Sequence, residues 1–500
     1  DKAEIVSVDE KHVYLQVENG MEKLKDHGAK PTRWAQVKDD VSPKELFALQ
    51  RGTAADRAKI ARYCLQDCDL VMELFMKLDV LNNSIAMANV CSVPVSFIFM
   101  RGQGVKIESL FFKECRLEDQ LIEVLPAPKN NFSKEPVPVI DGEGAPQEEQ
   151  VAADESYEGA FVLDPVTGIY FDDDPVGVPD FSSLYPSTII SENLCHSSLV
   201  WVKDHKLDGT VLTVQGSDEY DNIPGMSYID VDYDILINDP ADKRKHPKKI
   251  SDGLRVARFA QLNNGDKSTT PKILQKLLTS RKATRKKAEK EQDEFKKALL
   301  DAQQLAYKLT ANSLYGQLGS GTSKIRHVVI AASTTAYGRK QLIFAKTMIE
   351  SVYGGGKDPR CDAMCVYGDT DSIFVRWRPM DPSTGQRLSG DEAVRIAKEL
   401  TEESGALVSS CLKAPHDFEF DKVIYPFIIF SKKRYTGMFY EDSPDSCKEK
   451  SMGIVLKRRD NAPILKQIYG AAVQELLLRQ DVPAAVRVVK EGVRSLVEGK

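Results

Sequence analysis

The sequence predicts a multidomain protein of the α+β class. Its 500 residues exceed the ~100–200 residues of one compact domain. Residues 54–81 carry apolar side chains at helical spacing, whereas residues 159–186 contain short apolar strands separated by turns. No period of ~20–50 residues repeats, which argues against a solenoid.

Composition and charge are those of an ordinary globular protein. Acidic residues (74) outnumber basic residues (68), so binding by net charge alone is excluded, but a local basic groove is not. The longest apolar run, residues 423–430, is much shorter than a membrane span of ~20 residues, and we expect no membrane partner. The nine cysteines, an odd number, favour a reducing intracellular compartment. The chain begins without Met or a signal peptide, so we expect its N-terminus to lie upstream.

The remaining elements follow in an irregular order. We expect a proline- and acid-rich loop over residues 126–156 and a polar stretch with scattered short strands over residues 203–253. A long cationic helix over residues 271–297 and a second helix over residues 299–315 have a short link, which predicts an antiparallel hairpin. Residues 365–375 predict two strands around a tight turn, followed by alternating helices and short strands.

Three aspartates stand at the ends of short apolar strands. Asp180 ends the strand VGVPD, and Asp369 and Asp371 lie in the string GDTD of the later hairpin. Residues i and i+2 of a strand face the same side, so we expect Asp369 and Asp371 to project together. Buried carboxylates need a partner or a cation, and such oxygen ligands suit Mg²⁺. Taken singly, each motif favours an ordinary turn, because Asp is a common turn residue.

The predicted helix hairpin carries a cationic and polar face. No acidic residue occurs between Lys267 and Ala288, and Arg281 and Arg285 share a helical face. On the second helix Lys308, Asn312 and Tyr315 also share one face, which is not a core face. An ammonium, an amide and an aromatic ring suit a phosphate and a base. The alternative is a solvated charged helix, but solvated faces normally mix both signs of charge.

Two basic clusters follow late in the chain, in SKKRYTG (residues 431–437) and LKRRDN (residues 456–461). Such clusters suit a nucleic-acid backbone, which supplies affinity without sequence reading. Nuclear targeting is the alternative for short basic runs.

Four strings, in this order, resemble the B-family DNA polymerases: DFSSLYPSTI (180–189), KLTANSLYGQLG (308–319), YGDTDS (367–372) and KKRYTG (432–437). The resemblance covers residues 54–461 and continues more weakly to residue 500. Residues 87–106 and 451–463 are most similar to DNA polymerase delta and to the polymerases of large double-stranded DNA viruses of algae and protists. A cellular and a viral origin of this chain both stay open, and we favour the viral origin.

The resemblance implies a right-hand fold with an exonuclease domain before it. The implied domains are the end of a ribonuclease H-like 3′–5′ exonuclease domain (1–82), a connecting segment (83–155), the palm in two parts (156–266 and 321–463), the fingers helix hairpin (267–320) and the start of the thumb (464–500). We expect most of the thumb and the first part of the exonuclease domain to lie outside this chain.

The resemblance also implies roles for single residues. Asp180 and Asp371 would bridge two Mg²⁺ ions, together with the backbone of Phe181, and Asp369 would assist. The incoming deoxynucleotide would be bound by Phe181, Ser182, Ser183, Leu184, Tyr185, Arg281, Arg285, Lys308, Asn312 and Tyr315. The Tyr185 ring would exclude a 2′-hydroxyl, the group that separates RNA from DNA precursors. Position 285 is Arg where the family commonly has Lys, which keeps the charge but changes the geometry.

The implied partners are primer–template DNA, deoxynucleoside triphosphates and, by analogy with the delta group, a sliding clamp. Contacts to the duplex would come from Lys432, Lys433, Arg434, Tyr435, Lys457, Arg458 and Arg459. The primer 3′-hydroxyl would attack the α-phosphorus and release pyrophosphate, with two ions neutralising charge. Such an enzyme would work in a nucleus or in a cytoplasmic viral factory.

Tyr63 and Asp67 resemble the last exonuclease motif of this family. No Asp-x-Glu occurs among residues 1–60, so Asp67 alone cannot hold two metals and we expect no exonuclease activity from this chain. Without the family context, an ordinary amphipathic helix would explain both residues.

Two other functions are weighed against a polymerase. A non-catalytic DNA-binding relative would normally lose a metal carboxylate, yet all three aspartates are present. A reverse transcriptase usually has Tyr-x-Asp-Asp at the hairpin, where this chain has Gly-Asp-Thr-Asp. The cysteine spacings do not predict zinc, and no G-x-x-x-x-G-K-[ST] string predicts a P-loop.

Overall fold

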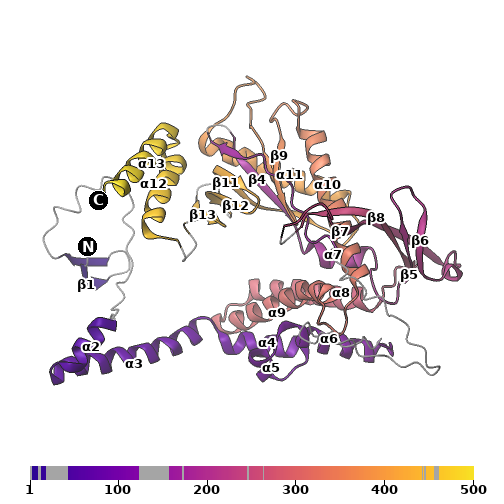
Figure 1. Ribbon diagram of the computed structural model, residues 1–500, viewed down its shortest axis with the longest axis horizontal. Coiled ribbons are helices and arrows are strands. Elements are labelled where there is room, and N and C mark those ends of the chain that lie inside the picture. Colours follow the sequence, from indigo (N-terminus) through magenta and orange to yellow (C-terminus); the bar gives the residue numbers. More distant parts are fainter. Residues whose placement is uncertain are drawn as a thin grey trace. The chain divides into compact units, whose positions relative to one another are not determined.

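The computed structural model describes residues 3–8, 13–17, 43–122, 157–171, 174–244, 247–262, 264–441, 443, 446–454, 456 and 461–499 (Figure 1). The chain forms two compact units, Asp1–Leu81 and Asn82–Lys500. Both contain helices and antiparallel strands, which confirms the predicted mixture of α and β structure. The predicted loop over residues 126–156 and the basic residues 457–459 lie outside the described residues.

The first unit contains two strands and two helices. β1 (Ala3–Val8) pairs with β2 (Val13–Val17), and α2 (Pro43–Arg51) precedes α3 (Ala54–Lys77). α3 begins at a capping box, in which Thr53 and Asp56 each accept the other's backbone N–H. The helix predicted over residues 54–81 is confirmed but ends earlier, because Asp79 has a left-handed φ of 49° and separates α3 from α4 (Val80–Cys91).

The second unit is built on a seven-stranded antiparallel sheet in the order β13-β12-β11-β4-β10-β9, with β3 paired to β11. Its strands are β3 (Gly168–Tyr170), β4 (Val176–Phe181), β9 (Met364–Asp369), β10 (Ser372–Arg376), β11 (Phe418–Ser431), β12 (Arg434–Tyr440) and β13 (Lys448–Met452). The hairpin predicted over residues 365–375 is therefore confirmed. A further strand predicted over residues 159–165 is wrong, since only an isolated bridge between Val162 and Asp369 forms there.

Each face of this sheet has its own core. On one face, Ile373 and Val375 pack against α10 (Val328–Tyr353) and α11 (Gly390–Ser410). On the other face, Phe374 joins an aromatic and aliphatic cluster that includes Val176 and Val178. This alternation follows from the two-residue period of a strand, and it gives β4 and β10 fixed positions in the sheet centre.

A second sheet has four antiparallel strands in the order β6-β5-β8-β7: β5 (Leu199–His205), β6 (Val211–Gly216), β7 (Met226–Asn238) and β8 (Lys249–Leu262). The expectation of scattered short strands over residues 203–253 is wrong, because β7 and β8 are 13 and 14 residues long. The acids of β7 have partners: Arg258 pairs with Asp230, and Lys340 of α10 pairs with Asp232. Neutralised side chains of this kind allow a polar sequence to form long strands.

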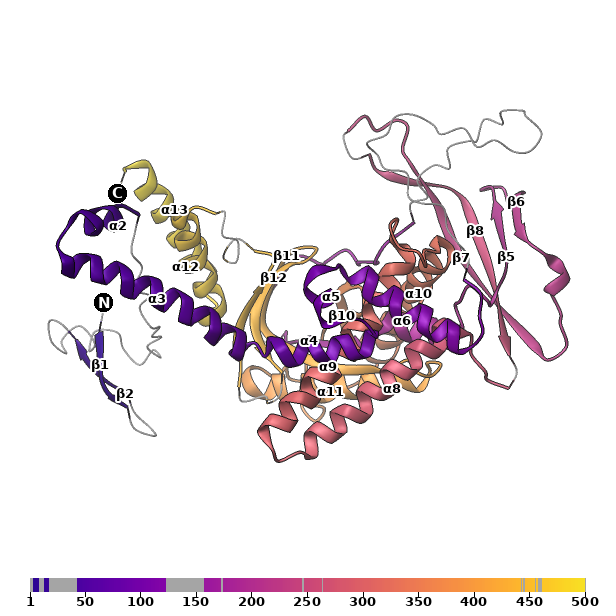
Figure 2. The ribbon, with the colours of Figure 1, turned by 90° about the horizontal axis from the view of Figure 1, so that it is seen from below.

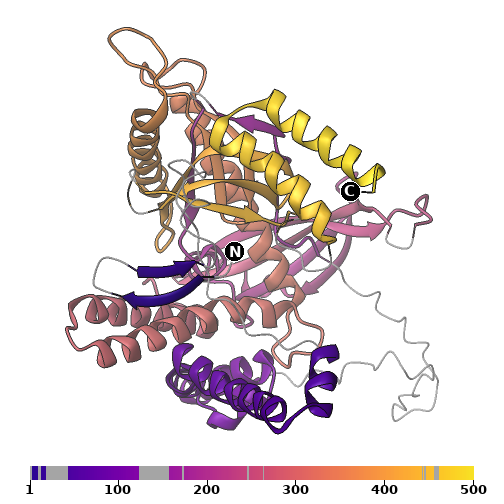
Figure 3. The same ribbon diagram turned by 90° about the vertical axis from the view of Figure 1, so that its left-hand side faces the viewer.

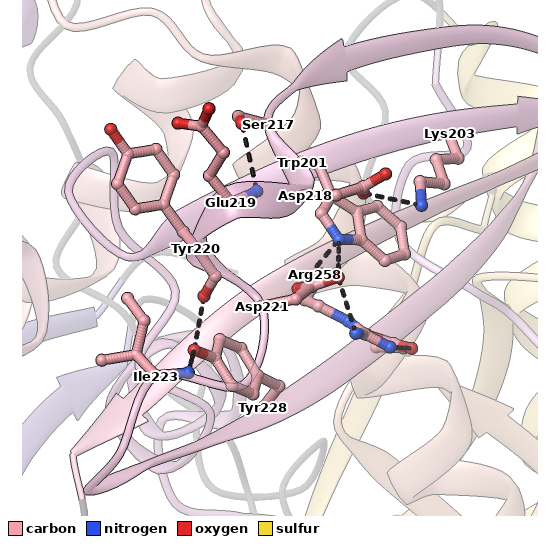
Figure 4. Close-up of polar contacts among 11 residues, drawn as sticks. Trp201, Lys203, Ser217, Asp218, Glu219, Tyr220, Asp221, Ile223, Tyr228 and Arg258 are labelled. Atoms are coloured by element: carbon pink, nitrogen blue, oxygen red, sulfur yellow. Dashed lines mark hydrogen bonds and ion pairs between the residues drawn. The ribbon is translucent and has the colours of Figure 1, made fainter.

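The short helix η1 (Asp218–Tyr220) is fixed to this sheet by a polar network around Trp201 (Figure 4). The Trp201 indole N–H donates to the Asp221 carboxylate at 3.0 Å, and Arg258 lies over the indole ring at 4.6 Å. Lys203 pairs with Asp218 at 3.0 Å. These contacts order a segment that would otherwise be a long exposed loop.

The predicted helix hairpin is confirmed. α8 (Thr269–Lys290) and α9 (Glu294–Gly319) are joined by residues 291–293 and lie side by side in Figures 1 and 2. α9 contacts α6 (Gln103–Leu117) and α7 (Leu184–Ser191), and α5 (Val95–Met100) precedes α6. Near the C-terminus α12 (Pro463–Arg479) packs along α13 (Val482–Val497) (Figure 3).

Among the described helices, none is long and apolar enough to cross a membrane. All nine cysteines are free thiols.

A glycine in the central strand β4 permits close packing of the sheet on α11. A Cβ atom at Gly177 would overlap Thr401 Oγ1 and Trp377 Nε1, which form a buried hydrogen bond of 2.8 Å. We therefore expect Gly177→Ala to destabilise the protein by about 1–3 kcal/mol, measured as a lower urea midpoint. Gly321→Ala is the control, because no atom lies within 4 Å of a Cβ there. Equal midpoints for the two variants would contradict this account of the packing.

Candidate active site

A cavity of about 500 Å³ lies between the centre of the seven-stranded sheet and the helix hairpin. Three regions far apart in the sequence line it. They contribute Asp180, Phe181, Ser182, Ser183, Leu184, Tyr185 and Pro186; Arg281, Arg285, Lys308 and Asn312; and Thr370, Asp371, Glu419, Phe420 and Asp421. Most of the residues predicted to bind the nucleotide are therefore brought together.

Asp180 and Asp371 are held close by strand pairing. Asp180 of β4 is the register partner of Ser372 of β10, and the Phe181 N–H donates to the Asp371 carbonyl at 2.8 Å. Burial, followed by the charge of Asp371, raises the pKa of Asp180 well above its ordinary value. Burial also raises the pKa of Asp371. Two carboxylates placed in this way repel each other when both are charged, and a cation between them would offset this electrostatic repulsion.

Asp369 lies differently from the prediction. It does not line the cavity; its carboxylate accepts the Lys433 ammonium at 2.6 Å and the Tyr367 hydroxyl at 3.1 Å. Asp369 ends β9 and Asp371 follows a turn at Thr370, whose φ is 62°, so the two residues differ in their surroundings, although the charge of Asp369 still helps to raise the pKa of Asp371. Two residues across a turn need not face the same side.

The wall of the cavity next to Asp180 is a sharp turn from β4 into α7. Ser183 has a left-handed φ of 57°, and the Ser182 N–H donates to the Asp417 carbonyl at 2.9 Å. The strand predicted to continue to residue 186 is wrong, because this turn starts a helix at Leu184. The backbone of residues 181–184 therefore curves around the cavity instead of extending past it.

The helix hairpin contributes to the cavity cations that have no strong ion pair among the described residues. Within the described part of the chain, Lys308 has no ion-pair partner, and the buried Arg281 Nε has no hydrogen-bond acceptor. Burial and then the charge of Arg285 lower the pKa of Arg281. Arg285 makes only an exposed pair with Glu289 at 3.5 Å, which is a weak interaction. These groups are available to an anion in the cavity.

Two tyrosines close one end of the cavity. The rings of Tyr185 and Tyr315 lie 4.5 Å apart, and burial raises the pKa of both hydroxyls, so they stay neutral. Tyr185 also rests on Gly338 of α10, where a Cβ would lie 3.0 Å from the ring. Tyr315 is thus a neighbour of the lining residue Tyr185 and not part of the lining itself.

Besides Pro186 and Thr370, which lie inside recognised strings, sequence reasoning missed three residues of the lining: Glu419, Phe420 and Asp421. They begin β11, where Glu419 is the register partner of Asp180. Burial, followed by Asp417, raises the pKa of Glu419. The sequence did carry a signal for them: Glu419 and Asp421 are two residues apart, shortly before the apolar run 423–430, as expected for acids on one face of a strand.

Of the described residues predicted to contact DNA, only Lys432, Lys433 and Arg434 are exposed. Lys432 pairs with Asp164 at 2.8 Å, Lys433 pairs with Asp369, and Arg434 is exposed. Tyr435 is instead half-buried, 5.4 Å from Phe374. Lys457, Arg458 and Arg459 lie outside the described residues. In the first unit, Tyr63 and Asp67 lie one turn apart on α3, with Asp67 exposed.

The model of DNA polymerase family B matches residues 93–499. This chain belongs to DNA polymerase family B. The predicted resemblance is therefore confirmed, and a reverse transcriptase is disfavoured. Within family B, the DNA polymerase of Pyramimonas orientalis virus is 42% identical over 511 residues, covering 93% of this chain and 38% of that relative.

Viral and cellular members of family B are both similar to the chain. The DNA polymerase of Paramecium bursaria Chlorella virus NY2A is 32% identical, covering 93% of this chain and 43% of that relative. The DNA polymerase delta catalytic subunit of Candida albicans is 32% identical, and the match covers 93% of this chain and 38% of that relative. The chain thus spans roughly two fifths of the length of these family B relatives.

The donor set of this family B cavity fits Mg²⁺ bound together with a phosphate. Within the described residues, no three histidine, cysteine, aspartate or glutamate side chains form a complete metal-binding group. Two carboxylates do meet, at Asp180 and Asp371, and Mg²⁺ commonly takes one or two carboxylates and completes its shell with substrate phosphates and water.

The repulsion between Asp180 and Asp371 gives a stability prediction. Without divalent cations, Asp180→Asn should stabilise the protein by on the order of 1–2 kcal/mol at pH 7.5, because the folded carboxyl must either take up a proton or carry an unfavourable charge, whereas an amide does neither. The folded-state pKa of Asp180 is raised, so its charge costs stability only above the unfolded-state pKa, and the gain should shrink toward pH 5. Thermal unfolding at both pH values measures the gain. The exposed Asp252→Asn is the control, and a loss of stability in Asp180→Asn at pH 7.5 would contradict the repulsion.

Proposed function

We propose that this chain carries the nucleotide-adding centre of a DNA-directed DNA polymerase. In this proposal the seven-stranded sheet is the palm, the α8–α9 hairpin is the fingers, and α12 and α13 begin the thumb. The observation that carries it is the single cavity in which Asp180 and Asp371 face Arg281, Arg285 and Lys308. Membership of family B supports the same assignment.

The cationic side of the cavity would bind the triphosphate of the incoming nucleotide. Arg281, Arg285 and Lys308 would hold its phosphate oxygens by charge-assisted hydrogen bonds, since their positive charges have no strong protein partner. The backbone of residues 181–184, which curves around the cavity, would contact the same group. These contacts fix the α-phosphorus in line with the primer.

Asp180, Asp371 and the backbone carbonyl of Phe181 would hold two Mg²⁺ ions. When bound, the ions supply the charge that lowers the pKa of the primer 3′-hydroxyl and neutralises the leaving group. The oxygen of that hydroxyl would bond to the α-phosphorus while its proton passes to water, the bond from the α-phosphorus to the bridging oxygen would break, and pyrophosphate would depart.

The tyrosine end of the cavity would select the sugar and the base pair. Tyr185 would lie under the deoxyribose, Asn312 and Tyr315 beside the nascent base pair, and Lys432, Lys433 and Arg434 along the primer–template backbone. Phosphate contacts of this kind position the duplex but carry no sequence information, which comes from template base pairing. Tyr63 and Asp67 would belong to a proofreading site completed by other parts of a longer protein.

The two aspartates provide the decisive test. Asp180→Ala and Asp371→Ala in the intact protein should each reduce Mg²⁺-dependent primer extension by a factor of about 10³ or more, because transition-state charge loses its main support. Duplex affinity should change little, measured by fluorescence anisotropy. Asp252→Ala, an exposed aspartate in β8, is the control and should extend normally. Wild-type-like extension by either cavity variant would refute the assignment.

The tyrosine end gives a separate prediction. Tyr185→Ala should increase the use of ribonucleotides relative to deoxynucleotides by about 10–100-fold, because the ring no longer meets a 2′-hydroxyl. Competition assays with both nucleotides measure this ratio. Tyr220→Ala, at an exposed tyrosine of η1, should leave it unchanged. An unaltered ratio in Tyr185→Ala would exclude the gate.

A further inference from the structure

A buried tyrosine joins the two turns that flank the candidate active site. Tyr367 is a β9 residue with 1% of its surface exposed. Its hydroxyl donates to Asp369 Oδ2 at 3.1 Å and accepts the backbone N–H of Lys433 at 3.0 Å. The first turn carries Asp369 and Asp371, and the second joins β11 to β12 and carries Lys432 and Lys433.

Both turns have backbone conformations that need support from their surroundings. Thr370 and Lys433 have left-handed φ angles of 62° and 61°, which are uncommon for residues other than glycine. The Lys433 ammonium reaches back to Asp369 at 2.6 Å. The Tyr367 hydroxyl therefore contacts both partners of this ion pair: the side chain of Asp369 and the backbone of Lys433.

The Tyr367 ring is fixed by its neighbours. Its centroid lies 5.1 Å from Phe374 and 6.3 Å from Tyr435. Burial raises the pKa of Tyr367, so the hydroxyl remains protonated and keeps donating to Asp369. Loss of this oxygen would leave the Lys433 N–H without its acceptor, which weakens the turn.

We propose that Tyr367 is a positioning residue whose buried hydroxyl holds the Lys432–Lys433 turn against the Asp369–Asp371 turn and thereby sets the affinity for primer–template DNA. The inference rests on the proposed function, in which the two lysines contact the DNA backbone. It assigns no contact between Tyr367 and substrate. Its effect would pass through the orientation of the lysine turn, and the nucleotide contacts on α8 and α9 would be untouched.

The test compares two tyrosine-to-phenylalanine variants of the intact protein. Tyr367→Phe should raise the dissociation constant for a primer–template duplex about three- to tenfold, the effect of one buried hydrogen bond, while KM for deoxynucleotides stays within twofold. Tyr353→Phe is the matched control: its buried hydroxyl also donates to a carboxylate, Glu403 at 3.0 Å, but at the end of α10. Tyr353→Phe should lose stability and keep its DNA affinity.

Hydrogen exchange gives a second measurement, and its wild-type part does not require the variant to fold. In the wild-type protein without DNA, the Lys433 amide should be protected, and in Tyr367→Phe it should exchange faster. An unprotected wild-type amide, or equal DNA affinities of the Tyr367→Phe and Tyr353→Phe variants, would overturn the inference. Absence of primer extension by the wild-type protein would instead count against the proposed function, because duplex affinity and hydrogen exchange do not depend on turnover.

Discussion

Two carboxylates that strand pairing forces together are the constraint on which the rest of this structure depends. Asp180 lies near the end of β4 and Asp371 lies in the turn directly before β10, and both are partly buried, so the folded protein carries an electrostatic cost. That cost is tolerated because β4 and β10 are fixed from both faces, by α10 and α11 on one side and by an aromatic cluster on the other. A rigid sheet centre is what keeps two repelling groups in place.

The positive groups opposite them come from a different kind of element. The hairpin of α8 and α9 projects Arg281, Arg285 and Lys308 into the cavity, but its cations are not paired with the two aspartates. Charges of both signs therefore face one volume without neutralising each other. This separation suits a ligand that carries both metal ions and phosphates, since each wall then meets the part of opposite charge.

Much of this arrangement could be predicted from residues, and the failures have clear causes. Periodicity located α3, α8 and α9, and four short strings identified family B together with most of the cavity lining. The position of Asp369 was not predictable, because a single left-handed residue at Thr370 redirects the chain. Glu419 and Asp421 were missed because their importance comes from pairing with a strand more than two hundred residues away. The long strands β7 and β8 were missed because ion pairs with a neighbouring strand and with α10, which a linear pattern does not show, neutralise acids of β7.

Gly338 has a consequence beyond packing. The residue lies on α10, behind Tyr185, and takes no part in lining the cavity. Any side chain larger than hydrogen at this position would force the Tyr185 ring to shift by a few tenths of an ångström, at the end of the cavity that we propose binds the sugar. Discrimination between the two kinds of nucleotide could thus drift during evolution through a backbone position that never meets a substrate. A survey of natural variation confined to the cavity would overlook this route.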